Sequence, residues 1–288
     1  MTILDDLVRQ LALERLEVNL YRGQSEDPGW GIVYGGQVLG QALSAAQQTV
    51  SDERTVHSLH AYFLRPGDVK APVVYDVDRS RDGSSFTTRR VTAIQHGAAI
   101  FHLAASFQKP EPGFDHQDEM PSVPDPETVP TDQERLAKEA HRFPSFMRAR
   151  VLAPRPIELR TVAEVDPMSA EVAPADRAVW FRAIHQLPDD VPGVHQALLA
   201  YASDASFLSV ALKPHAVSWL TPGMQVASID HAVWFHAPFR ADAWLLHVIH
   251  SPRTSGARGL VTGKVFSQDG RLVASTAQEG LIRQRARP

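Results

Sequence analysis

The sequence predicts an α+β fold built from two copies of one unit, each with a long helix and an antiparallel sheet. Three observations support this prediction. Strand-like alternation of apolar and polar residues dominates the chain, two helical segments interrupt it, and the order of helix, strands and turns in the first half returns in the second. The 288 residues, 43% of them hydrophobic, can bury a large core as one big domain or two small ones.

The first elements of the chain differ in their hydrophobic spacing. Residues 4–16 have the spacing of a short amphipathic helix, and residues 16–22 alternate as a half-buried strand does. A loop rich in Gly, Pro and Asp follows. Residues 37–46 are then expected to form a helix whose small Gly and Ala side chains would let it lie close to a sheet.

An antiparallel meander is predicted next. Strands are expected over residues 58–64, 73–79, 85–94 and 98–108. The segments that connect them contain turn residues: Arg65-Pro66-Gly67-Asp68, Arg81-Asp82-Gly83 and Gln95-His96-Gly97. Because tight turns join neighbouring strands that run in opposite directions, the first half is predicted to contain one antiparallel sheet.

The middle of the chain has a different composition. Prolines recur at positions 110, 112, 121, 124, 126 and 130 among acidic and polar residues. Such a segment cannot bury a core of its own, so it is predicted to be a linker that runs over the surface. Some helix is expected to return before residue 150. We therefore divide the chain into a first unit at residues 1–109, a linker at 110–150 and a second unit at 151–288.

The second half repeats the order of the first. Strands are expected over residues 157–162 and 178–185, a helix over 194–208, and further strands over 228–238, 243–250, 259–266 and 272–281. Overlaying Tyr62-Phe63 on Trp234-Phe235 also places Pro66 on Pro238. A long helix wrapped by a bent antiparallel sheet, present twice in one chain, is the double hot-dog arrangement. Joining the two sheets edge to edge would cover strand edges that are otherwise exposed.

Composition excludes several classes of protein. The net charge of −4 provides no basic surface for nucleic acid, and no cysteine is present to form disulfides, thiolate metal sites or a nucleophile. No run of 18 apolar residues occurs, so no membrane span is predicted. The first residues do not resemble a signal peptide, and residues 283–288 carry no peroxisomal address. We expect a soluble cytoplasmic protein, because a chain without cysteine suits a reducing compartment.

The two units differ at one position with chemical meaning. When Gly36-Gln37 is overlaid on His195-Gln196, Asp204 in the second unit corresponds to Ala45 in the first. A carboxylate beside the apolar face of a helix costs free energy unless it is paired, hydrogen-bonded or used in chemistry. A solvated Asp at the edge of a helix would produce the same pattern, so both interpretations remain open at this point.

Two further polar residues are candidates to act with Asp204. The overlay places Ser228 opposite Val56 or His57, and Gln278 opposite Ser106 or Ala105. Asp204 could accept a proton from water while the Ser228 hydroxyl and the Gln278 amide hold that water in line. The N-terminus of a helix would supply backbone donors for an acyl oxygen. The alternatives are that Ser228 caps a turn and that Gln278 is an exposed strand residue.

Other catalytic and metal-binding patterns are missing from the sequence. It contains neither a Gly-x-Ser-x-Gly nucleophile motif nor a His-Glu-x-x-His zinc motif. Residues 29–34 begin like a dinucleotide-binding loop but have a tyrosine in place of the third glycine. Two pairs of histidines lie three residues apart in strands and should point to opposite faces: His57 with His60, and His247 with His250. We therefore expect no metal site and no cofactor.

Longer motifs carry a resemblance to a known family. They are Tyr34-Gly35-Gly36-Gln37, Tyr201-Ala202-Ser203-Asp204 and residues 56–68, 81–86, 229–231, 234–236 and 268–280. Over essentially its whole length the chain resembles bacterial acyl-CoA thioesterase II, the double hot-dog thioesterases. The resemblance implies hydrolysis of a fatty acyl-CoA to free acid and CoA, without metal or covalent intermediate. Asp204, Ser228 and Gln278 match the family's water-activating trio, with Ser228 where many relatives have Thr.

The resemblance also implies how substrate would bind. The acyl chain would lie in an apolar tunnel between the halves, and CoA phosphates would meet surface cations. Candidate binding residues are Gly36, Arg253, Arg258 and His57, of which His57 is expected to line the tunnel or to have a structural role. A homodimer or homotetramer is expected.

Two rival functions remain open. A hydratase of the same fold would need a His–Asp or His–Glu pair, and His195 lies about two and a half helical turns before Asp204, too far to form one. A non-catalytic sensor would bind acyl-CoA without turnover.

Overall fold

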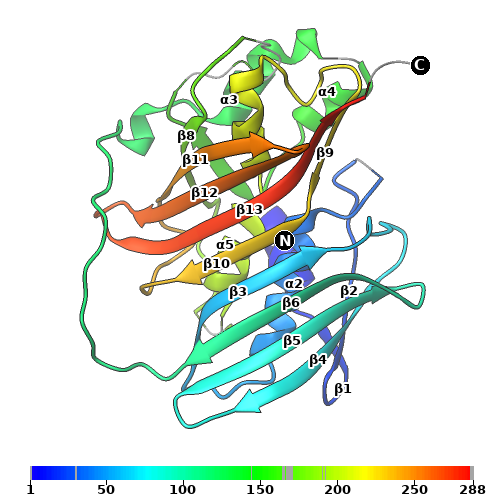
Figure 1. The fold of residues 1–288 in the computed structure, drawn as a ribbon, viewed down its shortest axis with the longest axis vertical. Helices are drawn as coiled ribbons and strands as arrows, with labels where there is room; N and C mark the ends of the chain where they lie inside the picture. Colours follow the sequence, from blue (N-terminus) through cyan, green and yellow to red (C-terminus); the bar gives the residue numbers. More distant parts are fainter. Residues whose placement is uncertain are drawn as a thin grey trace.

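The protein is described here by a computed structural model covering residues 2–29, 31–143, 145–163, 166, 171–189, 191 and 193–285. Within these residues thirteen strands form one antiparallel sheet in the order β1-β2-β4-β5-β6-β3-β10-β13-β12-β11-β8-β7, with β9 also paired to β13 (Figure 1). The two halves meet where β3 pairs with β10, for example at Leu59 and Val233. The joined sheet therefore has no free strand edge at its centre.

The first half contains two helices and six strands. They are α1 (Ile3–Leu11), β1 (Glu14–Glu17), β2 (Leu20–Gly23), α2 (Gly35–Gln47), β3 (Thr55–Phe63), β4 (Val73–Asp82), β5 (Phe86–Gln95) and β6 (Ala98–Gln108). The helix predicted over residues 4–16 ends early, and the strand predicted over 16–22 is a hairpin of two short strands. The alternation around Leu16 misled the prediction because that side chain is 44% exposed and packs in no core.

The proline-rich segment runs up the left edge of Figure 1, from the end of β6 past the strand ends of the second half. Met120 and Val123 pack against a cluster that contains Trp180 and Trp244, and the Trp180 indole donates to the Pro124 carbonyl over 3.0 Å. Short helices follow: η1 (Pro126–Thr128), α3 (Asp132–Glu139), η2 (Ala140–Arg142) and α4 (Ser145–Val151). The division of the chain at residues 109 and 150 stays a prediction.

The second half contains the remaining elements. They are β7 (Ile157–Thr161), β8 (Asp176–Ala183), α5 (Val194–Ser203), η3 (Phe207–His215), β9 (Met224–Ser228), β10 (Asp230–Phe235), β11 (Leu245–Ser255), β12 (Arg258–Ser267) and β13 (Leu272–Gln284). The strand predicted over 228–238 is divided at Ile229, whose N–H bonds the Glu279 carbonyl. Of the C-terminal segment 283–288, residues 286–288 lie outside the described part of the chain.

The helix predicted over residues 194–208 is also shorter than expected. It ends at Ser203, and Asp204 is its C-terminal cap. Ser206 then adopts a left-handed conformation with φ 57°, which turns the chain into η3. The apolar residues after Asp204 therefore belong to a separate turn that packs on β11, β12 and β13. Asp204 stands at a helix end rather than along a helix face.

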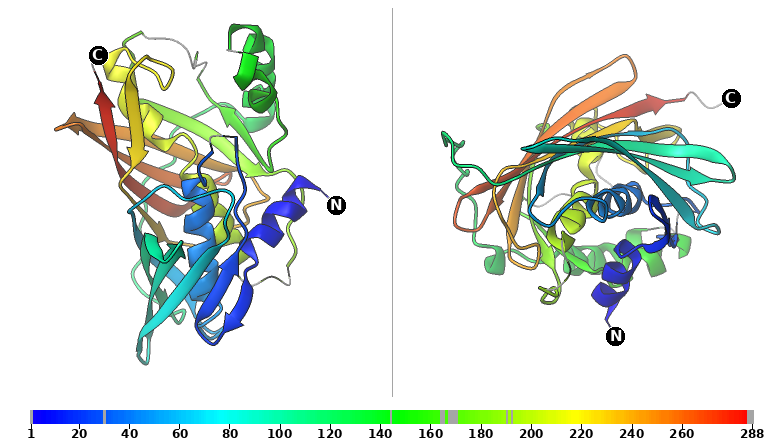
Figure 2. Two further views of the ribbon diagram at one scale, coloured as in Figure 1. Left: turned by 90° about the vertical axis from the view of Figure 1, so that its right-hand side faces the viewer. Right: turned by 90° about the horizontal axis from the view of Figure 1, so that it is seen from below.

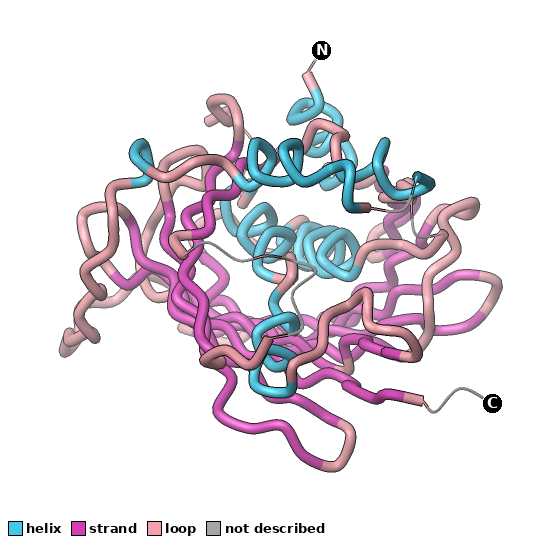
Figure 3. Tube along the Cα trace, turned by 90° about the horizontal axis from the view of Figure 1, so that it is seen from above, coloured by secondary structure: helices cyan, strands magenta, loops and turns pink. Residues whose placement is uncertain are grey.

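The helices α2 and α5 lie side by side and antiparallel on the concave face of the sheet (Figures 2 and 3). At one end the Tyr34 hydroxyl donates to the Tyr201 carbonyl over 2.9 Å, and at the other Gln47 donates to the Gly193 carbonyl over 3.5 Å. Their apolar faces form the centre of the core. Leu39, Leu43, Leu198 and Leu199 are fully buried there. The start of α2 therefore meets the end of α5.

This contact depends on a glycine at the start of α2. A Cβ atom at Gly36 would collide with the Tyr201 carbonyl oxygen and lie 2.5 Å from the Tyr34 ring. Neither a backbone carbonyl nor a ring enclosed in the core can move away cheaply. No helix in the described part of the chain is long and apolar enough to cross a membrane.

We expect Gly36→Ala to weaken the fold, because one methyl group must separate two packed helices. Overpacking of this kind costs roughly 1–3 kcal/mol of unfolding free energy. Urea unfolding followed by circular dichroism measures the change. The control is Gly113→Ala in the linker, where a Cβ atom meets nothing within 4 Å. Equal stability of the two variants would contradict the close contact of the helices.

Candidate active site

Asp204 is held where the two central helices meet. Its side chain is 7% exposed. A Cβ atom at Gly35, the first residue of α2, would lie 2.7 Å from Asp204 Oδ2 and 3.1 Å from the Phe63 ring. The carboxylate therefore stands directly beside the N-terminus of α2. The positive end of the helix dipole favours a negative charge at this place.

Gln278 connects the three candidate catalytic residues. Its Nε2 donates to Asp204 Oδ1 over 2.8 Å and to Ser228 Oγ over 2.7 Å, and the side chain is 1% exposed. The three residues come from three elements. β13, which carries Gln278, pairs with β9 at Gly280 and Ser228, and the inner face of β13 meets the end of α5 at Asp204. Both amide hydrogens are used in these bonds. The Ser228 hydroxyl proton and Asp204 Oδ2 are thus left for another group.

Two residues that the sequence reasoning did not select lie beside Asp204. His231, on β10, is fully buried with its Nδ1 4.0 Å from Asp204 Oδ1. Burial lowers the pKa of His231, against the opposing effects of Asp204, Asp230 and Gln278. Tyr34 precedes α2, and burial followed by the Asp204 charge raises its pKa well above the ordinary value. The alternation of His231 with Val233 and Phe235 along β10 was the available sign that His231 faces inward.

The first half lacks an acid at the corresponding place. Ala45 is fully buried in α2, and His57 Nε2 contacts Ser106 Oγ at 2.8 Å across β3 and β6. Ser106 lies on the outer face of β6, so of the two residues that the overlay placed opposite Gln278 it is Ala105 that faces inward. Burial lowers the pKa of His57. His57 therefore lies on the outer face of the first half and does not join the Asp204 cluster.

The other predicted binding residues are divided between the two faces of the sheet. Gly36 lies at the start of α2, next to the contact between Gly35 and Asp204. Arg253 and Arg258 are exposed on the hairpin of β11 and β12, where Arg258 Nε pairs with Glu279 at 3.0 Å. Because side chains alternate along β13, Glu279 and its partner Arg258 lie on the face opposite Gln278. The structure thus brings Gly36, and not Arg258, to the face that carries the trio.

His247 and His250 point to opposite faces of β11, as the strand spacing predicts, whereas His57 and His60 both lie on the outer face of β3, because a β-bulge interrupts the alternation there. His247 is buried with its Nε2 2.9 Å from Thr276 Oγ1, whereas His250 is exposed and pairs with Asp176. Across the described residues, no group of three or more His, Cys, Asp or Glu side chains is arranged to hold a metal ion.

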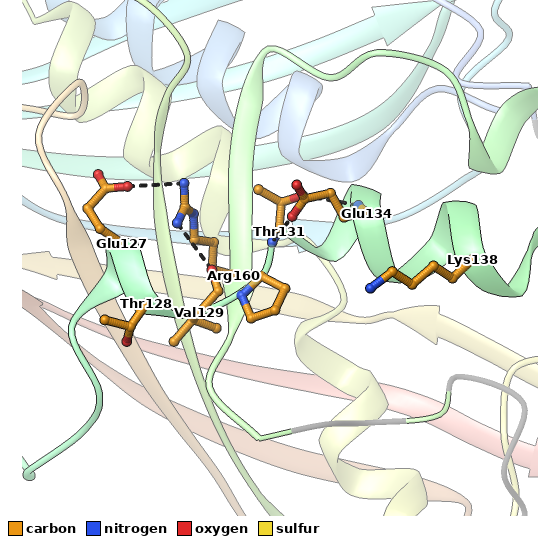
Figure 4. Close-up of a pocket in the computed structure, with 8 residues that line it drawn as sticks. Glu127, Thr128, Val129, Thr131, Glu134, Lys138 and Arg160 are labelled. Carbon is orange, nitrogen blue, oxygen red and sulfur yellow. Dashed lines mark hydrogen bonds and ion pairs between the residues drawn. The ribbon is translucent and has the colours of Figure 1, made fainter.

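A pocket of about 450 Å³ lies away from the trio, between η1 and α3 (Figure 4). The arginine in its lining is already engaged: Arg160 pairs with Glu127 at 3.3 Å and with Glu158 at 2.6 Å. The described residues that line it include none of Asp204, Ser228 and Gln278. We therefore assign this pocket no part in the chemistry of the trio.

The buried amide predicts how stability depends on pH. In Gln278→Glu the introduced carboxyl group would lie beside the Asp204 carboxylate, which raises its folded pKa above the unfolded value of about 4.3. Such a group fits the fold best while it is neutral, and the loss of stability grows as pH rises through the raised pKa.

We therefore expect Gln278→Glu to be destabilised more at about pH 8 than at about pH 5, relative to the unmodified protein. Urea unfolding at both pH values measures this difference. Gln268→Glu, in an exposed turn, introduces the same charge and should show no such dependence. An identical response of the two variants would mean that Gln278 does not meet Asp204.

Comparison with known proteins identifies the family. The family model described as acyl-CoA thioesterase matches residues 149–281, and the model of the acyl-CoA thioesterase N-terminal domain matches residues 26–108. The chain is 46% identical over 281 residues to acyl-CoA thioesterase 2 of Haemophilus influenzae, covering 98% of both chains.

Solved structures agree with this result. The crystal structure of acyl-CoA thioesterase II TesB2 from Mycobacterium marinum has a TM-score of 0.78 and 42% identity, over 97% of this chain and 99% of that one. A protein with a hot-dog fold from Alicyclobacillus acidocaldarius, at 22% identity, has a TM-score of 0.76 over 99% of this chain and 100% of that one, and supports the fold alone. With tandem matches in its two halves, the chain belongs to the acyl-CoA thioesterase family, hydrolases of the double hot-dog fold.

Proposed function

We propose that the protein hydrolyses fatty acyl-CoA to free fatty acid and CoA, with Asp204 as the general base. The observation that carries this proposal is the single buried amide of Gln278, which holds both Asp204 and Ser228. A carboxylate fixed in this way, with a hydroxyl proton and a second oxygen still available, is suited to bind and deprotonate one water molecule.

The reaction would proceed by direct attack of water. Asp204 removes a proton as the water oxygen forms a bond to the acyl carbon, while the Ser228 hydroxyl keeps that water in line and Gln278 holds Asp204 and Ser228 in place. The N–H groups of Gln37 and Val38 donate to the Tyr34 carbonyl, so it is the backbone N–H groups of Gly35 and Gly36, at the start of α2, that would stabilise the oxyanion. Collapse of the intermediate breaks the C–S bond, and the proton returns to the sulfur. This sequence requires neither a metal nor a covalent enzyme intermediate.

The surroundings of Asp204 and an activity assay distinguish the proposed function from its rivals. His195 accepts a bond from the Ala241 N–H at the opposite end of α5, so it cannot form a hydratase pair with Asp204. A sensor would bind acyl-CoA with the same residues and release no thiol. An assay of turnover therefore separates the proposed hydrolase from the sensor.

We expect Asp204→Asn to lose about 10²- to 10⁴-fold in kcat, the usual contribution of a general base, and to keep its affinity for acyl-CoA. Thiol release from acyl-CoAs of increasing chain length measures turnover, and calorimetry measures binding. Asp230→Asn is the matched control, because Asp230 lies on the neighbouring strand and bonds the Glu279 N–H over 2.7 Å. Undiminished hydrolysis by Asp204→Asn would exclude this site, and no hydrolysis by the unmodified protein would favour the sensor.

We also propose that the protein forms a homodimer or homotetramer in the cytoplasm. The absence of cysteine supports a reducing compartment, and the exposed Tyr62 on the outer face of β3 supports a further contact there. Light scattering measures the mass in solution. A value equal to the 31.8 kDa of one chain would exclude an oligomer.

A further inference from the structure

His231 and Gln278 face each other across neighbouring strands. β10 pairs with β13 at Ala232 and Ala277, and the next step along this register places His231 opposite Gln278. Both side chains are buried. Residues directly opposed on one face of an antiparallel pair have Cβ atoms about 4.5–5.5 Å apart, so their side chains can interact. His231 therefore lies next to the amide that connects the candidate catalytic residues.

Each of these two side chains has one polar atom left over. Gln278 Nε2 donates to Asp204 and to Ser228, so Gln278 Oε1 is directed away from both. Among the residues that the structure describes, Gln278 Oε1 and His231 Nδ1 are buried without a hydrogen-bond partner of regular geometry. A buried amide oxygen that receives no proton costs free energy. A donor for Oε1 is therefore needed, and His231 is the neighbour that can supply one.

The ionisation of His231 is consistent with a donor at this place. Burial is the largest influence and lowers the pKa of His231, which keeps the ring neutral near pH 7 with a single proton. The charges of Asp204 and Asp230 and hydrogen bonding with Gln278 act in the opposite direction and raise this pKa. A hydrogen bond raises the pKa of an imidazole when the ring donates, because the bond then favours the protonated form.

Ser203 allows the single imidazole proton to stand on Nδ1. Ser203 Oγ lies 2.9 Å from His231 Nε2 and 2.9 Å from the Ala200 carbonyl, so its hydroxyl can donate to either. If it donates to the carbonyl, the imidazole proton is on Nε2, and the lone pairs of Nδ1 and Gln278 Oε1 face each other. If it donates to Nε2, the imidazole proton is on Nδ1 and can bond Oε1. The second arrangement makes as many hydrogen bonds and leaves neither Nδ1 nor Oε1 without a partner.

We propose that His231 donates a hydrogen bond from Nδ1 to Gln278 Oε1 and thereby fixes the orientation of the Gln278 amide. This inference rests on the proposed function, since it concerns the amide that holds the base of that reaction. A glutamine amide has two orientations that exchange its oxygen with its NH₂ group. Only the orientation with Oε1 at His231 directs the amide hydrogens to Asp204 and Ser228. His231 is a positioning residue, and it exchanges no proton with water or substrate.

The tautomer of His231 can be measured without activity. In the unmodified protein, ¹⁵N spectra of histidine-labelled material should show His231 protonated on Nδ1 and not on Nε2, and the signal is assigned by its absence from His231→Asn. Asp204→Ala removes the other oxygen near Nδ1, at 4.0 Å. The proton should stay on Nδ1 in that variant, because Gln278 still accepts it. A proton on Nε2 in either protein would overturn the inference.

Two substitutions of His231 separate this role from simple packing. In His231→Asn the amide nitrogen can take the place of Nδ1 and donate to Gln278, whereas in His231→Gln the amide reaches the place of Nε2 and meets Ser203 instead. We expect His231→Gln to lose about tenfold in kcat, the effect of one hydrogen bond, with KM unchanged. His231→Asn should stay closer to the unmodified enzyme. Packing alone predicts the reverse order, because Gln is nearer to His in size.

The matched control is His247→Gln. His247 is also buried and packs on Phe207 at a centroid distance of 5.2 Å, but its Nε2 bonds Thr276 Oγ1. This variant should keep its kcat. The inference is overturned if His231→Gln is at least as active as His231→Asn, or if His247→Gln loses as much as His231→Gln. Hydrolysis that survives Asp204→Asn overturns the proposed function, whereas an inactive Asp204→Asn beside a His231 proton on Nε2 overturns this inference alone.

Discussion

The site depends on the close antiparallel contact between α2 and α5. Because glycine stands at the start of α2, the backbone of α5 approaches to the point where a Cβ atom would collide with the Tyr201 carbonyl. This approach places the C-terminal cap of α5 against the N-terminus of α2, so the Asp204 carboxylate lies beside the positive end of the α2 dipole. The position of the Asp204 carboxylate follows from where these two helix ends meet.

The sheet supplies the other half of the site. β13 is long enough to pair with β9 and β10 in turn, and Gln278 lies at the point where the pairing changes. Its inward amide therefore reaches Asp204 on one side and Ser228 on the other. The first half has the same framework but carries Ala45 in α2 and Ala105 on the inner face of β6. The site geometry thus places the candidate acid in the second half.

Periodicity anticipated most strands, because inward and outward residues alternate regularly wherever one face of the sheet is buried. Periodicity failed at Leu16, where a residue that fits an alternating pattern is exposed. It also failed after Asp204, where the helix ends although the apolar spacing continues. The repeat and the resemblance suggested that three residues form one cluster: Asp204, Ser228 and Gln278. His231 was missed because one inward histidine on a strand has the same pattern as any core residue.

The sequence by itself determined the α+β class, the repeat of one unit in two halves and the family, because hydrophobic spacing and long motifs are local properties of the chain. Only the tertiary structure decided that α5 ends at Ser203, that one amide joins Asp204 to Ser228, and that the buried His231 lies 4.0 Å from the same carboxylate. These features depend on distances between residues up to 74 positions apart, such as Asp204 and Gln278. Packing sets such distances, and no spacing along the chain encodes them.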